Sequence, residues 1–328
     1  MSHGSPDDRQ PTEIRLRRKP LRWVNHRWRW LRVILSILIT YVVLVLMFAL
    51  VQRSMIYLPT REARIEPRAA LLPHGQVHTV TVPANDQLEI RGWHVLADGR
   101  SADSRDDCDQ ELAAGRRVVL YFSGNAANRR YRVPEFTVLT SLETDVFIFD
   151  YRGYGDNSGS PSEEMLAADA LATWNYVTQE RKVRPDRVIL YGESLGGAVA
   201  VRLAAELCEA DNPPAGLILR STFSSLVDAG AHHYPWLPVR LALVDRFLSI
   251  DRIPQVTCPI LQIHGARDRI MPIALGRRLF AAATERSSSG IAKEFVELAS
   301  AGHNDVTVVA TPELRSAIQG FLTKLDEL

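Results

Sequence analysis

The sequence predicts an α/β fold in which a mostly parallel sheet is flanked by helices and preceded by an N-terminal transmembrane helix. Apolar runs of strand length alternate with amphipathic helical stretches through most of the 328 residues. From Arg117 onward the strand-like runs are almost continuously apolar, as in parallel strands that are covered on both faces. Residues 33–51 form a separate, uncharged run. Alternating strands and helices of this kind build βαβ units with right-handed crossovers.

Composition and charge exclude several classes of protein. Hydrophobic residues make up 46% and charged residues 23% of the chain, close to globular averages and unlike a disordered or fibrous protein. Residues 1–32 carry nine Lys and Arg against three acids, so the remainder is mildly acidic although the whole chain has a net charge of +1. An acidic body argues against a nucleic-acid partner. The three cysteines show no spacing typical of a zinc site or a redox pair.

Residues 33–51 read VILSILITYVVLVLMFALV and would span about 28 Å as a helix, close to the hydrocarbon thickness of a bilayer. Aromatic residues flank this run at Trp23, Trp28, Trp30 and Tyr57. A buried core helix and a cleaved signal peptide are the alternatives. The run is apolar all round, is longer than the apolar region of a signal peptide and precedes a poor cleavage site. The sequence therefore predicts a retained signal anchor.

The charges beside the anchor predict its orientation. Basic residues gather on its N-terminal side, which favours a cytoplasmic location for the arm formed by residues 1–32. Four arginines that follow the anchor weaken this difference. We expect a single-pass membrane protein that contacts the lipid bilayer through this helix. Its N-terminus would be cytoplasmic and the domain at residues 55–328 extracytoplasmic, which in a Gram-negative bacterium means the periplasmic side of the inner membrane.

Eight runs are predicted to be strands of one sheet: Val77–Val82, Leu88–Val95, Arg117–Ser123, Asp145–Asp150, Arg187–Tyr191, Ala215–Leu219, Ile260–His264 and Glu294–Leu298. The first two alternate polar and apolar residues, as in an antiparallel edge hairpin. Helical patterns cover residues 162–180, 195–209 and 272–284. Residues 97–115 are polar and acidic, and we expect an exposed insertion there. Residues 221–257 are too long for an ordinary connection and are predicted to form a short helical lid.

A strand-to-helix turn carries the first chemical signal. The strand that ends at Tyr191 runs into Gly192-Glu193-Ser194-Leu195-Gly196-Gly197 and then into a helical pattern, which is a G-x-S-x-G nucleophile elbow in its proper context. Residues two positions from the serine crowd it, and glycine has no Cβ to clash there. The turn would expose the Ser194 hydroxyl and aim the backbone N–H of Leu195 at a reacting carbonyl.

A serine nucleophile needs a base, and the base needs an acid that orients it. Asp268 follows the penultimate strand and His303 follows the last one, so both are expected at the same sheet edge as Ser194. Asp228 is the reserve candidate for the acid. His264 ends a strand and is predicted to be structural.

The loop after the third strand is predicted to complete an oxyanion hole. It reads SGNAAN from residue 123, where Gly124 permits close approach and the backbone N–H of Asn125 is the expected donor. Residues 153–158 fall one glycine short of a dinucleotide fingerprint and lack its acidic partner, which argues against NAD. We expect neither a metal nor an organic cofactor.

Five segments in this order resemble the α/β-hydrolase superfamily, and within it the membrane-anchored Bem46/ABHD13-type serine hydrolases. The segments are SGNAAN, DYRGYG with the following SGSPSE, GESLGG, HGARD and GHND, and the resemblance covers about residues 55–328. It implies an α/β-hydrolase fold and a Ser194–His303–Asp268 triad. The family commonly has His-Gly-Asn in the oxyanion loop, whereas this chain has Ser123 in place of the histidine.

The expected activity is that of a serine hydrolase that cleaves carboxylic ester or thioester bonds of acyl or lipid-like substrates through an acyl-enzyme. Tyr234, Trp236 and Leu237 in the lid are the candidate substrate contacts, because an apolar, aromatic lid on a membrane-tethered domain favours an acyl chain. Two alternatives remain open. A serine peptidase of the same fold would use acids in the lid region, Asp228, Asp245 or Asp251, to hold a substrate amine. A membrane-tethered binding protein would lack turnover. The sequence leaves the oligomeric state open.

Overall fold

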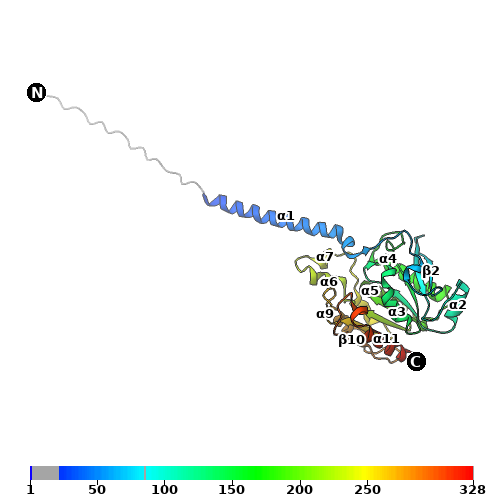
Figure 1. Ribbon diagram of the computed structural model, residues 1–328. Coiled ribbons are helices and arrows are strands. Elements are labelled where there is room, and N and C mark those ends of the chain that lie inside the picture. Colours follow the sequence, from blue (N-terminus) through cyan, green and yellow to red (C-terminus); the bar gives the residue numbers. More distant parts are fainter. Residues whose placement is uncertain (2–21, 85, 328) are drawn as a thin grey trace. The chain divides into compact units, whose positions relative to one another are not determined.

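The structure is a computed structural model that describes residue 1, residues 22–84 and residues 86–327. It divides into two compact units, Met1–Phe48 and Ala49–Leu328. Helix α1 (Arg22–Ile56) is long and apolar enough from Arg27 onward to be a candidate membrane span, with a mean hydropathy of 2.9 in its most apolar window (Figure 1). Most of the predicted basic arm, residues 2–21, lies outside the described residues, and so does the side chain of Trp23.

The second unit is built on an eight-stranded sheet with the order β10-β9-β8-β7-β4-β6-β3-β2. Its strands are β2 (Val77–Pro83), β3 (Glu89–Val95), β4 (Val118–Phe122), β6 (Asp145–Phe149), β7 (Val188–Glu193), β8 (Gly216–Arg220), β9 (Ile260–Gly265) and β10 (Glu294–Leu298). The β2–β3 and β3–β6 pairs are antiparallel and every other pair is parallel. The predicted eight strands and the antiparallel edge hairpin are confirmed.

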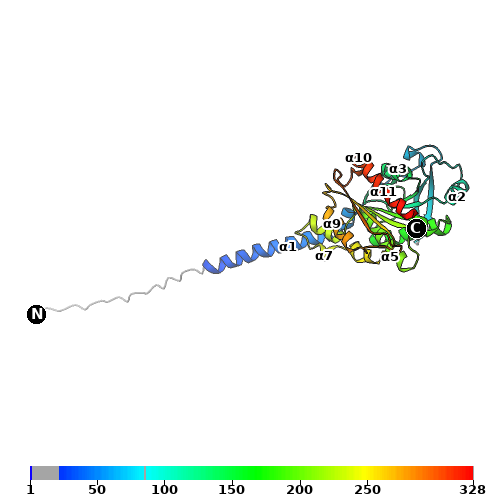
Figure 2. The ribbon, with the colours of Figure 1, turned by 90° about the horizontal axis from the view of Figure 1, so that it is seen from below.

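The central strands are buried on both faces, which explains why they read as continuous apolar runs. In β4, Leu120 belongs to one core cluster, while its neighbours Val119 and Tyr121 belong to the other. Helices that supply the first cluster are α4 (Glu163–Asn175), α5 (Leu195–Glu209) and α9 (Ile273–Ala282). Helices that supply the second are α3 (Val133–Thr140), α10 (Val306–Val309) and α11 (Thr311–Asp326) (Figure 2). Because β6, β4, β7, β8, β9 and β10 run in the same direction, the loops that follow them all lie at one edge of the sheet.

Two stretches differ in detail from their predictions. The expected exposed insertion at residues 97–115 contains helix α2 (Arg105–Ala113), which begins with Ser104 as its N-cap. Cys108 and Leu112 lie one helical turn apart in α2 and are buried, so a largely polar composition concealed one apolar face. The region at residues 221–257 forms α6 (Leu226–His233), α7 (Val239–Ala242), α8 (Ser249–Arg252) and one 3₁₀ turn.

The cysteines are free thiols, but two of them are not isolated in space. The hydrogen bond between Cys208 and Cys258, separated by fifty residues in the chain, is the largest of the influences that lower the pKa of Cys208 to about 5. The backbone N–H of Thr257 also donates to the Cys208 sulfur, at 3.3 Å. Sequence spacing alone did not reveal this pair.

Candidate active site

Ser194 occupies the turn between β7 and α5 in a backbone conformation that L-residues rarely adopt, with φ 52° and ψ −114°. Its N–H donates to the Arg220 carbonyl at 2.8 Å, and the Thr222 hydroxyl donates to the Ser194 carbonyl at 2.8 Å. A Cβ on Gly196 would lie 2.1 Å from the Phe122 carbonyl oxygen. The neighbouring strand therefore presses directly against this turn, and only glycine fits at that position.

The structure brings Ser194, His303 and Asp268 together from three separate loops. His303 Nε2 lies 3.1 Å from Ser194 Oγ, and His303 Nδ1 lies 2.6 Å from Asp268 Oδ2. Each loop follows the carboxyl end of a parallel strand, namely β7, β9 or β10. An imidazole bridging a hydroxyl and a carboxylate is the arrangement in which one nitrogen can accept a proton while the other is held by the acid.

Asp268 is fixed and ionised by its surroundings. Its Oδ1 accepts hydrogen bonds from the N–H groups of Ile270 at 2.9 Å and Met271 at 2.7 Å. Burial acts to raise the pKa of Asp268, but hydrogen bonds from His264 and His303 outweigh it and hold the pKa far below its usual range. His264 itself contacts the Met271 carbonyl at 2.8 Å, so this histidine supports the acid loop.

The reserve acid lies elsewhere. Asp228 accepts from the Ser224 hydroxyl at 2.8 Å and pairs with Arg278 at 3.1 Å. Asp228 thus forms part of the contact between the lid region and α9, while Asp268 occupies the position beside His303.

Residues 123–128, which we call the oxyanion loop, are tied to the chain that follows the anchor helix. Leu58 N–H donates to the Asn125 carbonyl at 2.9 Å, and the Asn125 amide donates to the Ile56 carbonyl at 2.8 Å. The short parallel pair β1 (Leu58–Pro59) and β5 (Ala126–Ala127) continues this contact. The backbone of the loop is therefore held from outside the sheet. Leu195 is the first residue of α5, so its N–H has no acceptor within that helix.

Two tyrosines fix the same loop from the other side. Tyr151 donates its hydroxyl proton to the Ser123 carbonyl at 2.8 Å, and Tyr154 donates to the Asn125 carbonyl at 2.7 Å. The Ser123 hydroxyl, which replaces the family's histidine, is buried and makes no hydrogen bond to the described part of the chain. The sequence singled out the DYRGYG segment but gave its tyrosines no role, because their partners are backbone atoms that no side-chain pattern records.

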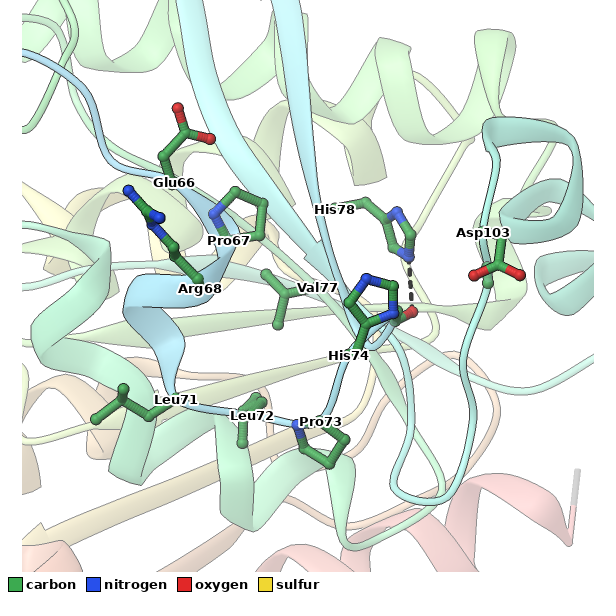
Figure 3. A pocket seen from close by; sticks show the side chains of 12 residues that line it. Glu66, Pro67, Arg68, Leu71, Leu72, Pro73, His74, Val77, His78 and Asp103 are labelled. Atoms are coloured by element: carbon green, nitrogen blue, oxygen red, sulfur yellow. Dashed lines mark hydrogen bonds between the residues drawn. The ribbon is translucent and has the colours of Figure 1, made fainter.

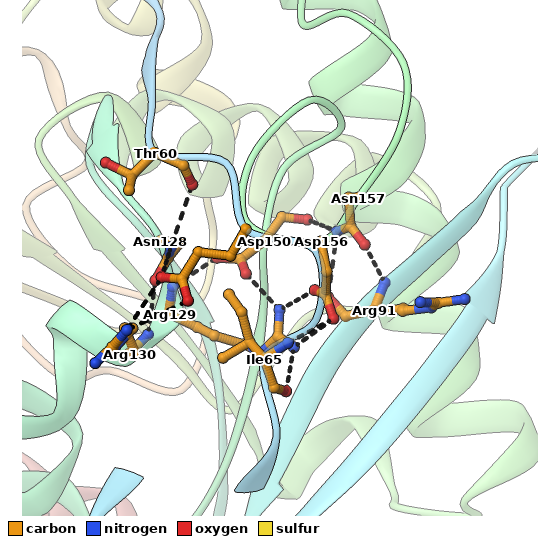
Figure 4. Close-up of polar contacts among 10 residues, drawn as sticks. Thr60, Ile65, Arg91, Asn128, Arg129, Arg130, Asp150, Asp156 and Asn157 are labelled. Carbon is orange, nitrogen blue, oxygen red and sulfur yellow. Dashed lines mark hydrogen bonds and ion pairs between the residues drawn. The ribbon is translucent and has the colours of Figure 1, made fainter. Parts of the chain in front are cut away.

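A buried arginine anchors the base of this loop. Arg129 is fully buried and pairs with Asp150 at 2.5 Å and with Asp156 at 2.7 Å, while it also donates to the Ile65 carbonyl at 3.0 Å (Figure 4). Asn128 donates to the Thr60 carbonyl at 3.2 Å in the same cluster. The cluster joins residues 60–65 to the loops after β4 and β6.

A second buried charge network lies directly behind the nucleophile. Arg220 contacts Glu135 and Glu193, each at 2.7 Å, and Arg132 contacts Glu193 at 3.1 Å. Burial acts to raise the pKa of Glu193, but the charges of Arg220 and Arg132 lower it to about 2. Tyr121 adds a hydrogen bond to Glu193 at 2.6 Å. Glu193 immediately precedes Ser194, so the network fixes the strand end that presents the hydroxyl.

A cleft of about 560 Å³ opens beside Ser194 and His303. Leu58, Asn125, Ile270 and Val306 contribute to its wall. The predicted substrate contacts Tyr234, Trp236 and Leu237 do not line this cleft within the described part of the chain. They form the turn after α6, in which Leu237 N–H donates to the Tyr234 carbonyl and Tyr234 N–H to the Gly230 carbonyl. The turn folds back on its own helix, and the apolar wall comes from other segments.

A larger hollow of about 950 Å³ lies away from these groups, between residues 66–78 and residues 102–103 (Figure 3). His78 Nε2 lies 2.7 Å from the Gly75 carbonyl there. Across the residues that the structure describes, no group of three His, Cys, Asp or Glu could hold a metal ion. None of the residues that line this hollow is Ser194, His303 or Asp268.

The sheet and the loops at its carboxyl edge define an enzyme of the hydrolase class. The chain belongs to the α/β-hydrolase family. A family model described as "alpha/beta hydrolase fold" matches residues 117–249. An uncharacterised protein of Mycobacterium tuberculosis is 39% identical over 83% of this chain and 88% of its own length. Lysophosphatidylserine lipase ABHD12 of Danio rerio is 31% identical over 75% of this chain and 69% of its own length.

Solved structures are similar in fold. An esterase of Pyrococcus furiosus superposes with a TM-score of 0.60 at 18% identity, covering 82% of this chain and 97% of that one. An α/β hydrolase of Vibrio vulnificus superposes with a TM-score of 0.59 at 16% identity, covering 81% and 96% of the two chains. The resemblance that the five sequence segments carry is confirmed, and so is the prediction of a hydrolase.

Proposed function

We propose that the chain is a membrane-anchored serine hydrolase that cleaves carboxylic ester or thioester bonds of acyl or lipid-like substrates. The observation that carries the proposal is the continuous contact from Ser194 Oγ through the His303 ring to Asp268, at 3.1 and 2.6 Å. The strained backbone at Ser194 and the adjoining cleft support it.

In the proposed reaction, Ser194 Oγ attacks the acyl carbonyl while His303 Nε2 takes its proton. Asp268 holds the resulting imidazolium through Nδ1, and the N–H groups of Leu195 and Asn125 stabilise the oxyanion. The ester bond breaks, and His303 returns the proton to the departing alcohol or thiol. Water then attacks the acyl-enzyme, with His303 again as base, and releases the acid and Ser194.

The cleft and the relatives support the proposed substrate class. Leu58, Ile270 and Val306 make one part of the wall apolar, which suits an acyl chain. Another part is charged, because Arg132, Glu135, Glu193 and Arg220 also line the cleft. Several relatives are named as lysophosphatidylserine lipases, and a solved neighbour is named as an esterase. We therefore propose an acyl ester of a lipid as the substrate of this chain.

The peptidase alternative has less support. Two of the three acids considered for holding a substrate amine are engaged in ion pairs, Asp228 with Arg278 at 3.1 Å and Asp245 with Arg53 at 2.9 Å. Asp251, the third, is not among the residues that line the cleft in the described chain.

The charges beside the anchor suggest on which side of the membrane the catalytic domain lies. We propose a cytoplasmic N-terminus and an extracytoplasmic catalytic domain, because basic residues precede the apolar helix. Protease added to sealed vesicles of known sidedness tests this topology. Digestion of the domain from the cytoplasmic face alone would reverse it.

Labelling by a fluorophosphonate probe tests the chemistry. We expect the full chain to be labelled and Ser194→Ala not to be, while the exposed-serine control Ser160→Ala is labelled like the parent. Labelling of Ser194→Ala would overturn the proposal. A series of p-nitrophenyl esters then tests the substrate class, since we expect turnover to rise with acyl length, and a sharp preference for acetate would contradict a lipid ester.

A further inference from the structure

Two of the three cysteines meet in the fold although they lie far apart in the chain. Cys208 is in the last turn of α5, and Cys258 lies two residues before β9 begins. A hydrogen bond joins the two thiols, and the backbone N–H of Thr257 donates to the Cys208 sulfur at 3.3 Å. The third cysteine, Cys108, is in α2 and belongs to a different core cluster. Cys208 and Cys258 therefore form a pair of their own.

The packing around the pair keeps the two sulfur atoms close. The turn at residues 253–255 packs against α5, and Val256 after it is fully buried. Cys258 is buried in the core cluster against which Cys208 packs. Because the backbone at Thr257 already touches Cys208, the sulfurs need only approach from hydrogen-bond contact to about 2 Å to form a disulfide, which a change in side-chain torsion can supply.

The two thiols differ in acidity and in access. The hydrogen bonds from Cys258 and from the Thr257 N–H outweigh burial and lower the pKa of Cys208 to about 5, so Cys208 is a thiolate at neutral pH. Its hydrogen bond to Cys208 and its own burial raise the pKa of Cys258 well above the usual range. Cys208 is half-buried, whereas Cys258 is buried. Cys208 is therefore the better nucleophile of the two.

A hollow of about 480 Å³ borders the pair, with Thr257 and Cys258 among the residues that line it. Ala215 and Pro259, which directly precede β8 and β9, line it as well. The hollow thus lies at the amino ends of these strands, at the opposite edge of the sheet from Ser194. A space of this size can admit a small organic molecule.

We propose that Cys208 and Cys258 are a redox-active dithiol, which a small organic disulfide oxidises to an intramolecular disulfide. The Cys208 thiolate attacks one sulfur of the incoming disulfide, a mixed disulfide forms, and the first thiolate leaves. Cys258 then loses its proton to solvent and attacks the Cys208 sulfur, and the second thiolate leaves. Two protein thiols are oxidised, and the small disulfide is reduced to two thiols.

The order of these steps follows from the contact between the two cysteines. Once Cys208 is capped in the mixed disulfide, Cys258 loses both the hydrogen bond to the Cys208 thiolate and the repulsion by its negative charge. Two of the influences that raised the pKa of Cys258 are then gone, and burial remains. The buried thiol thus becomes able to react only after its partner has reacted.

The disulfide would join two elements that carry catalytic residues at their other ends. Helix α5 begins directly after Ser194, and β9 leads at its carboxyl end to Asp268. The loop closed between residues 208 and 258 contains β8 and the whole lid region at residues 221–257. Closing a loop of this length restricts the unfolded chain, so oxidation should stabilise the domain without adding a group to the cleft.

Thiol counting on the full chain in detergent tests the proposal. The reduced chain is incubated with oxidised glutathione, and its remaining thiols are alkylated in urea. We expect the alkylated thiols to fall from three to one, with the Cys208 and Cys258 peptides linked and Cys108 alkylated. The melting temperature should rise by at least about 4 °C on oxidation. Three alkylated thiols, a link through Cys108 or an unchanged melting temperature would overturn the proposal.

Single variants test the order of attack. Cys258→Ser lacks the second thiol, so we expect it to stop at a stable mixed disulfide of Cys208 with one glutathione. Cys208→Ser keeps only the buried thiol of the pair and should stay unmodified. Cys108→Ser is the matched control and should form the disulfide like the parent. Glutathione bound to Cys258 in Cys208→Ser would overturn the assignment of Cys208 as the attacking thiol.

The proposal stands apart from ester hydrolysis. The thiol count on the parent needs no substitution, so it decides the question even where a variant fails to fold. Loss of fluorophosphonate labelling at Ser194 would count against the proposed function and leave the disulfide unaffected. A full thiol count after oxidation would overturn the disulfide and leave the proposed function unaffected.

Discussion

The side-chain amide of Asn125 donates to the carbonyl oxygen of Ile56 at 2.8 Å, which joins the oxyanion loop to the last residue of the anchor helix. Leu58 N–H returns a hydrogen bond of 2.9 Å to the Asn125 carbonyl. A single neutral hydrogen bond contributes only about 1 kcal/mol to stability. Its larger consequence is geometric, because the backbone of Asn125 is held from both sides at the place where we propose an oxyanion donor.

Asn125→Ala should therefore impair turnover more than binding. Without its tie to Ile56 the loop loses a constraint on the Asn125 N–H, and we expect kcat for p-nitrophenyl acetate to fall about ten-fold while KM stays nearly constant. Gln52→Ala is the control, since it loosens the same helix end from the lid but leaves the loop contacts intact. A raised KM with unchanged kcat would contradict this role.

Asp268→Asn should reduce kcat by about 10⁴-fold, because an amide cannot hold the His303 ring in the tautomer that accepts a proton from Ser194. Asp228→Asn provides the comparison, as Asp228 bonds to Ser224 and Arg278 instead. Initial rates with one ester under identical conditions decide between the two acids. A greater loss in Asp228→Asn would transfer the orienting role to that residue.

The sequence predicted those parts of the site that rest on local patterns. The turn around Ser194 is encoded by a strand, closely spaced glycines and a helix, all within one short segment. The positions of Asp268 and His303 follow from strand order, because successive parallel strands deliver their loops to one edge. The ties from Tyr151 and Tyr154 to the oxyanion loop could not be predicted, since they depend on how distant loops pack.

The substrate contacts predicted in the lid region also depend on packing that the sequence does not record. The apolar and aromatic composition of the lid singled out Tyr234, Trp236 and Leu237. Composition does not say, however, toward which part of the protein a side chain points. The cleft instead uses Leu58, which belongs to the chain that follows the anchor, and Ile270, which follows the acid loop. Both were unremarkable in sequence because neither belongs to a motif.

Arg220→Met tests the buried charge network. The substitution leaves Glu135 and Glu193 buried without the cation that contacts both, and we expect the free energy of unfolding to fall by about 3–5 kcal/mol. Arg184→Met removes an exposed ion pair with Asp186 and should change stability by less than about 1 kcal/mol. Urea unfolding of the two variants beside the parent measures the difference. Similar losses in both would contradict the network's role.

Glu193 should make stability depend on acidity. Its pKa is about 2 in the folded protein, whereas an unfolded glutamate titrates at about 4.3. The unfolded chain binds more protons in that range, so this stabilising contribution is present above about pH 4.3 and is lost as the pH falls toward 2. We expect Glu193→Gln to be less stable than the parent at pH 6, with the difference shrinking by pH 3. A constant difference across this range would rule out Glu193 as a source of the acid sensitivity.

Two glycines in helices should respond to alanine in opposite directions. A Cβ on Gly196 would lie 2.1 Å from the Phe122 carbonyl oxygen and 2.5 Å from that of Ser123. These are backbone atoms, so the end of β4 and the oxyanion loop must shift together, and we expect kcat to fall about 100-fold or more. Gly320 in α11 has nothing within 4 Å of its Cβ position. Gly320→Ala should therefore raise the free energy of unfolding by about 0.5–1 kcal/mol through helix propensity and leave kcat unchanged. An active Gly196→Ala would show that the turn at Ser194 tolerates the displacement, and the close approach of β4 would then not be what positions the nucleophile.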